Sequence, residues 1–125
     1  MVEVRFRRDS RNRLSSLVST GHAGQADHGE DVVCAAVSAL VQAAWAGLAE
    51  VAGIAVTGHR REGDVLMRWP EAERERADVS AIVATAELAI KQIASQPEYA
   101  RFVRYVSEPE PEQNPGTPAW KGTTR

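Results

Sequence analysis

The sequence has a single cysteine, Cys34, so one chain cannot form an internal disulfide. A lone thiol favours a reducing compartment, and we expect a cytoplasmic protein. The net charge is also small: the value of −2 argues against binding to nucleic acid or a membrane through overall charge. We find no apolar run long enough to cross a bilayer without a charge, and the alternating charges of "MVEVRFRRDS" do not fit a signal peptide.

The chain length and composition fit one modest globular domain. A chain of 125 residues can bury one hydrophobic core, and its 43% hydrophobic and 26% charged residues are ordinary for a soluble globular protein. From Glu108 onward the composition changes to Pro, Gly, Thr and charged residues. We therefore predict a single domain over residues 1–107 and a disordered, flexible tail over residues 108–125.

Five segments have the patterns of strands. Val2, Val4 and Phe6 alternate with charged residues, which is typical of a half-buried strand. The turn "DSRNR" and a return strand "LSSLVST" complete a hairpin. Residues 54–70 predict a second hairpin around the turn "REGD", and "FVRYV" predicts a last strand over residues 102–106.

Two segments have helical periodicity. In residues 30–50 the apolar stripe is wider than that of an ordinary amphipathic helix, comprising Val33, Val37, Leu40, Ala44 and Leu48, with Val32, Ala36, Val41 and Trp45 beside them. The second helix is expected from Pro70 to about Ser95, with a solvated first part over residues 71–76 and a core stripe of Val79, Ile82, Val83, Ala86, Ile90 and Ile93.

The element order is therefore β-β-α-β-β-α-β, which predicts a two-layer α+β fold. A helix as apolar as residues 30–50 needs cover on more than one side. In so small a domain, a second subunit is one source of that cover, and we expect a homodimer.

Cys34 lies near the start of the first helix, where the backbone dipole favours a thiolate. At exposed sites the dipole contributes only about 0.3–1 kcal/mol. Asp31, three residues earlier on the same face, opposes it by a similar amount. A nucleophilic thiol here needs a histidine, and His22 and His28 are the nearby ones. The plain alternative is a small buried hydrophobe.

The stretch "GHA", a gap, and "GEDVVCAAVS" resembles the signature of the bacterial ribosomal-processing cysteine protease family, Prp. The family pattern is G-H-A, a flexible loop, and G-x-D-I-V-C-A-x-V-S. Val32 stands where isoleucine is usual, and eleven residues separate His22 from Cys34. The close similarity covers residues 21–38.

The resemblance implies a cytoplasmic, homodimeric cysteine endopeptidase (a hydrolase) without a cofactor or metal. Its substrate is expected to be the N-terminal extension of a large-subunit ribosomal protein precursor, which is removed during ribosome biogenesis. Cleavage is expected to follow a short motif with bulky aromatic residues. Cys34 has the role of nucleophile and His22 that of base. Backbone N–H groups at the helix start are candidate donors to the oxyanion.

Other residues of the signature have expected supporting roles. Asp31 either orients His22 or is a plain helix-start carboxylate, and Ser38 either supports the site or bonds back to its own helix. The loop that meets the substrate is expected to comprise Gly21, Ala23, Gly24 and Gly29. His28 is read as a loop residue.

Three alternatives remain open at this point. His22, His28, Asp31 and Cys34 are possible zinc ligands of a small metal-binding protein, although their spacing is not that of a standard zinc motif. A non-enzymatic ribosome-associated factor is the second alternative. A divergent family member with another substrate is the third.

Overall fold

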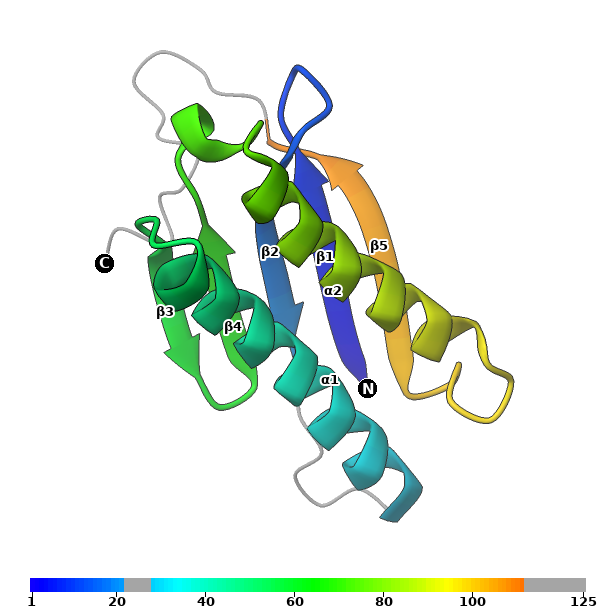
Figure 1. Cartoon of the computed structure of the whole chain (residues 1–125). Coiled ribbons are helices and arrows are strands. Elements are labelled where there is room, and N and C mark those ends of the chain that lie inside the picture. The colour runs from blue at the N-terminus through cyan, green and yellow to red at the C-terminus, as the bar shows by residue number, and fades with distance from the viewer. Residues whose placement is uncertain (22–27, 112–125) are drawn as a thin grey trace.

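The computed structural model describes residues 1–21 and 28–111, which form a five-stranded sheet with two helices packed on one of its faces (Figure 1). This arrangement confirms the expected two-layer α+β fold and the order of its elements. The elements are β1 (Val2–Arg8), β2 (Leu14–Thr20), α1 (His28–Ala46), a π-helical turn η1 (Gly47–Val51), β3 (Thr57–Arg61), β4 (Asp64–Arg68), a 3-10 turn η2 (Glu71–Glu73), α2 (Ala77–Ser95) and β5 (Val103–Pro109).

The strand order in the sheet is β3-β4-β2-β1-β5. The two hairpins pair antiparallel, β4 joins β2 antiparallel, and only β5 runs parallel to its neighbour β1. Side chains alternate between the two faces along each strand. Val4 and Phe6 are buried beneath the helices, whereas Arg5 and Arg7 lie on the opposite face and pair with Glu108 of β5.

The core lies between the sheet and the two helices. The helical stripes expected from the sequence supply it, with Leu40, Ile82 and Ile93 only partly buried. Trp69 is almost fully buried after β4, and its indole Nε1 donates a hydrogen bond to the carbonyl of Leu14, 2.9 Å away. The core members on the helices are Val33, Val37, Val41, Ala44, Val79, Val83, Ala86 and Ile90.

Helix α1 begins at His28, two residues before the expected start, and its regular part ends at Ala46. Its outward side is apolar and exposed: Val32 is 50% exposed, and the alanines at 35, 36, 39, 43 and 46 are also exposed. The two layers of this chain therefore cover only the sheet side of the unusually apolar helix.

One helix bears on the expectation that no apolar run is long enough to cross a bilayer without a charge. Residues Asp31–Val51, which include Asp31 and Glu50, are long and apolar enough by length and composition. This is weak evidence for a membrane span, because the core helix of a soluble protein passes the same test. Here Val33, Val37 and Val41 are buried against the sheet, as in a core helix.

Residues 70–76 do not form the first part of the second helix. Pro70 is extended (φ −64°, ψ 145°), Arg76 is extended again (ψ 136°), and α2 starts at Ala77. Arg74, expected in a solvated segment, is only 6% exposed. Its Nε and Nη2 donate to the carbonyl of Trp69, at 3.2 and 2.9 Å, and this inward-facing arginine requires a non-helical path.

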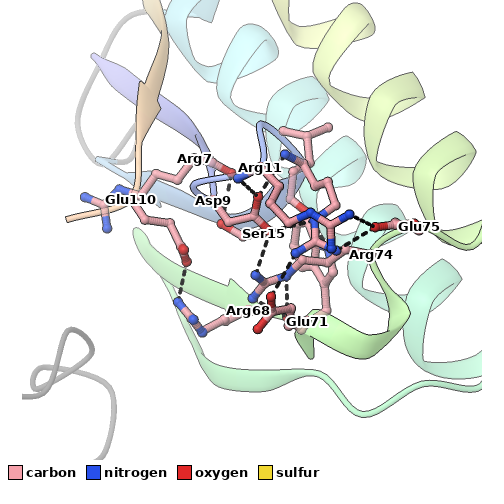
Figure 2. Close-up of polar contacts among 12 residues, drawn as sticks. Arg7, Asp9, Arg11, Ser15, Arg68, Glu71, Arg74, Glu75 and Glu110 are labelled. Carbon is pink, nitrogen blue, oxygen red and sulfur yellow. Dashed lines mark hydrogen bonds and ion pairs between the residues drawn. The ribbon is translucent and has the colours of Figure 1, made fainter. Parts of the chain in front are cut away.

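The buried guanidinium of Arg74 is neutralised by Asp9 in the β1–β2 turn, at 3.0 Å (Figure 2). Arg13 also pairs with Asp9 and reaches Glu71 and Glu75. Burial alone would raise the pKa of Asp9. Hydrogen bonds from the backbone of Arg13, the side chain of Arg74 and the backbone of Arg11 outweigh burial and hold that pKa below its ordinary value.

Strand β5 continues to Pro109, three residues past the expected end of the last strand at 106. Glu108 pairs with Arg5 and Arg7. Figure 2 shows the pair that Glu110 forms with Arg68. The boundary expected between residues 107 and 108 therefore falls inside a strand. Residues 112–125 of the expected tail lie outside the described part of the chain.

Asp9→Ala should destabilise the fold by about 3–5 kcal/mol, because it leaves the buried Arg74 without its anion. Urea unfolding measures the change. Since the folded state holds the pKa of Asp9 down, its contribution is present above the ordinary pKa of 3.8 and is lost as pH falls through the lower folded-state pKa.

Arg11→Ala is the matched control, because it removes a largely exposed pair with Glu75. It should change the unfolding free energy by less than about 1 kcal/mol. Asp9→Ala and Arg11→Ala variants of equal stability would contradict this role of Asp9.

Candidate active site

A cleft of about 480 Å³ lies between the middle of α1 and the tip of the β3–β4 hairpin. The ends of β1 and β2 close it on the sheet side. Buried valines and exposed polar side chains both line it, which suits a peptide with both main-chain and apolar side-chain groups. The lining residues that matter below are Gly21, Cys34, Ser38, Gln42, Arg60 and Val65.

Cys34 lies in the second turn of α1, half-buried against the core, and it lines the cleft. The early start of α1 moves it further from the helix end than expected. The dipole effect falls off beyond the first turn, so the helix alone activates this thiol less than it would a first-turn thiol. The N–H groups without intrahelical partners belong to the first turn, residues 28–31.

Ser38 and Gln42 follow Cys34 at intervals of one helical turn and line the same cleft. Gln42 Nε2 donates a hydrogen bond to Ser38 Oγ at 3.0 Å. Ser38 was expected to support the site, but Gln42 was missed. A signal was available, since Ser38 and Gln42 are the only hydroxyl or amide side chains between Val32 and Ala49.

The β3–β4 hairpin forms the opposite wall. The guanidinium of Arg60 lies over the ring of Trp45 of α1, 4.6 Å from the ring centroid. Such a cation–π contact holds the hairpin wall against the helix. The sequence contained no signal for this contact, because it depends on the sheet register that places β3 beside α1.

Gly21 directly follows β2 and lines the cleft. Its N–H donates to the carbonyl of Gly63 in the hairpin tip, at 2.9 Å. Its φ is +98°, and a Cβ there would lie 2.2 Å from the carbonyl oxygen of Met1. Only glycine fits this position, and it is the last described residue before His22.

The remaining residues of the signature do not all lie at the cleft. Asp31 is exposed in the first turn of α1 and is not among the residues that line the cleft. Gly29, expected in the substrate loop, is part of α1, and so is the backbone of His28, which was also expected in the loop. The expected roles of His22, Ala23 and Gly24 concern residues outside the described ranges.

The zinc alternative depends in part on residues outside the described ranges. Within the described residues, no three His, Cys, Asp or Glu side chains come together as a metal site. The side chains of His22 and His28, which the zinc hypothesis needs, lie outside that part of the chain.

Comparison with known sequences identifies similar proteins. A sequence model of the family described as "Cysteine protease Prp" matches residues 1–104. The ribosomal processing cysteine protease Prp of Bacillus subtilis is 40% identical over 53 residues, which are 42% of this chain and 47% of that protein. The match thus spans about half the length of this curated relative.

Solved structures have the same fold. SMU.848 from Streptococcus mutans superposes with a TM-score of 0.77 at 26% identity, covering 87% of this chain and 98% of that one. A ribosomal processing protease Prp from S. aureus, in complex with a substrate peptide, gives a TM-score of 0.71 at 17% identity, covering 86% and 99%. At 17% identity the similarity supports the fold alone.

Gly21→Ala should destabilise the protein more than Gly53→Ala. Both glycines have positive φ, but a Cβ at Gly53 meets nothing within 4 Å, whereas one at Gly21 meets the Met1 carbonyl. The positive φ costs an alanine about 1–2 kcal/mol at either position. Thermal or urea unfolding of both variants measures the additional cost at Gly21, and equal losses would contradict the close approach to Met1.

Proposed function

The chain belongs to the Prp family of cysteine proteases, and from that membership we propose that it is an endopeptidase in which Cys34 is the nucleophile and His22 the base. The observation that carries the proposal is that Cys34 and Gly21 line one cleft. Gly21 is fixed at the hairpin tip, and His22 follows it directly in the sequence. The position of Gly21 in this cleft supports the choice of its neighbour in the sequence, His22, as the base.

The reaction follows from these two groups. The imidazole of His22 accepts the proton of the Cys34 thiol, and the thiolate attacks the scissile carbonyl carbon. The C–N bond breaks as the imidazolium returns the proton to the leaving amine, and a thioester remains. Water, deprotonated by His22, then hydrolyses the thioester, releases the carboxylic acid and restores the thiol. The unpaired N–H groups of the first turn of α1 are candidate donors to the oxyanion.

The proposed substrate is the N-terminal extension of a large-subunit ribosomal protein. The name of the Bacillus subtilis relative supports ribosomal processing. The cleft supports a peptide with a bulky apolar side chain near the cleaved bond, because Val37, Val41 and Val65 line it beside Cys34. Ribosome assembly and a reduced lone thiol both fit a cytoplasmic location.

We also propose a homodimer formed through the outward side of α1. No charged side chain occurs between Val32 and Ala49. The exposed residues on that side are small and apolar, and Leu88 of α2 adds a further apolar side chain that is 56% exposed. Exposed apolar side chains on an uncharged helix surface are typical of an obligate interface between subunits.

Cleavage of a peptide that spans the ribosomal-protein extension, followed by mass spectrometry, tests the dyad. Cys34→Ala should abolish cleavage, and Cys34→Ser should be nearly as inactive, because a hydroxyl is far harder to deprotonate. His22→Ala should also be inactive, whereas His28→Ala should keep most of the activity.

The His22 and His28 variants are matched controls for each other, since both remove one imidazole from the segment between β2 and the helix. Normal cleavage by Cys34→Ala would refute the mechanism. An inactive His28→Ala together with an active His22→Ala would show that the base is misassigned. Circular dichroism should be unchanged in all four variants.

Sedimentation at micromolar concentration should give about twice the chain mass of 13.6 kDa. Ala39→Arg places a charge in the middle of the proposed interface and should shift the protein toward the monomer. Ala72→Arg, at an exposed site in η2, is the control and should leave the dimer intact. A wild-type monomer would refute the homodimer.

A further inference from the structure

We propose that Gln42 is a substrate-binding residue that hydrogen-bonds the main chain of the substrate peptide two helical turns away from Cys34. The proposal rests on the peptidase function proposed above and deepens it. Gln42 is exposed, lines the cleft with Cys34 and Ser38, and is not part of the family signature quoted above.

The placement of polar groups along α1 supports this role. Cys34, Ser38 and Gln42 lie four residues apart and therefore form one row along the helix. The sheet side of the helix is buried, and its outward side is built of alanine and valine. The hydroxyl and amide side chains thus occur only on the side that lines the cleft.

The hydrogen bond to Ser38 orients the carboxamide of Gln42. One hydrogen of Nε2 is donated to Ser38 Oγ. A second Nε2 hydrogen and the Oε1 acceptor remain for a ligand. A donor beside an acceptor is complementary to the C=O and N–H of an extended peptide, so the side chain can bind a substrate whatever its side chain at that position.

Helix geometry gives the subsite that Gln42 would contact. Eight residues along α1 correspond to about 12 Å. An extended peptide advances about 3.3 Å per residue, so Gln42 is level with a residue about four positions from the attacked carbonyl. The opposite wall at this end includes Arg60, which is held against α1 by its contact with Trp45. The cleft is therefore walled on both sides at that distance.

Steady-state kinetics on a series of peptides tests the assignment. The longest peptide extends six residues on each side of the cleaved bond, and the others lose one residue at a time from either end. Gln42→Ala should lower kcat/KM on the longest peptide by about tenfold, mainly through KM, as expected for two neutral hydrogen bonds. The kcat/KM of the wild type should fall by the same factor when the peptide loses the residue about four positions from the attacked carbonyl. On that shorter peptide the wild type and Gln42→Ala should have equal kcat/KM.

Two further variants separate binding from folding. Gln42→Glu keeps the size of the side chain but removes both amide hydrogens, and it should behave like Gln42→Ala on the longest peptide. Gln92→Ala replaces an exposed glutamine of α2 that does not line the cleft, and it should match the wild type on every peptide. Alanine is a strong helix former, so both alanine variants should fold.

The kinetics distinguish a substrate-binding role of Gln42 from a structural one. A penalty from Gln42→Ala that is the same on long and short peptides would show a structural role and overturn the proposal, and so would the absence of a penalty. Failure of the wild type to cleave any peptide would instead refute the peptidase function, and the substrate role of Gln42 with it.

Discussion

The hydrogen bond from the N–H of Gly21 to the carbonyl of Gly63 is the constraint on which the geometry of the cleft depends. It joins the residue after β2 to the tip of the β3–β4 hairpin, and both glycines line the cleft together with Cys34. The main chain of Gly21 passes so close to Met1 that no side chain fits. Main-chain packing therefore fixes the position of Gly21, the residue that precedes His22 in the sequence.

Helix α1 meets three different surroundings around its circumference. Val33, Val37 and Val41 are buried against the sheet, while Cys34, Ser38 and Gln42 line the cleft. The third side is exposed and uncharged. The same helix that positions the nucleophile is thus available to a second subunit, which couples the proposed dimer interface to the proposed site through one rigid element. This division also explains why the apolar pattern of the helix exceeds that of an ordinary amphipathic one.

The order of the elements was predictable from the sequence because it depends on local periodicity, as in the alternation of Val2, Val4 and Phe6. The expectations that were wrong concern residues whose partners are distant in the chain. Arg74 was expected to be solvated, because its ion-pair partner Asp9 lies 65 residues away in the sequence. Glu108 begins a stretch whose composition is typical of a disordered tail, but its ion pairs with Arg5 and Arg7 hold it in β5.

The candidate site shows the same division. Cys34 and Ser38 were recognisable from a local signature, and both line the cleft. Gln42 and Arg60 were not, because their roles depend on the hairpin lying beside one side of α1. A row of polar residues on an apolar helix is a local signal, but its meaning depends on which element faces it.

The nucleophilic role of Cys34 is tested most directly by a peptide that ends in a chloromethyl ketone at the position of the scissile carbonyl and carries the sequence of the ribosomal-protein extension. The dyad predicts that this reagent alkylates Cys34 with saturation kinetics, much faster than a scrambled peptide does, and that uncleaved substrate protects the thiol. Equal, non-saturating rates for both peptides would contradict it, because Cys34 would then react as an ordinary accessible thiol.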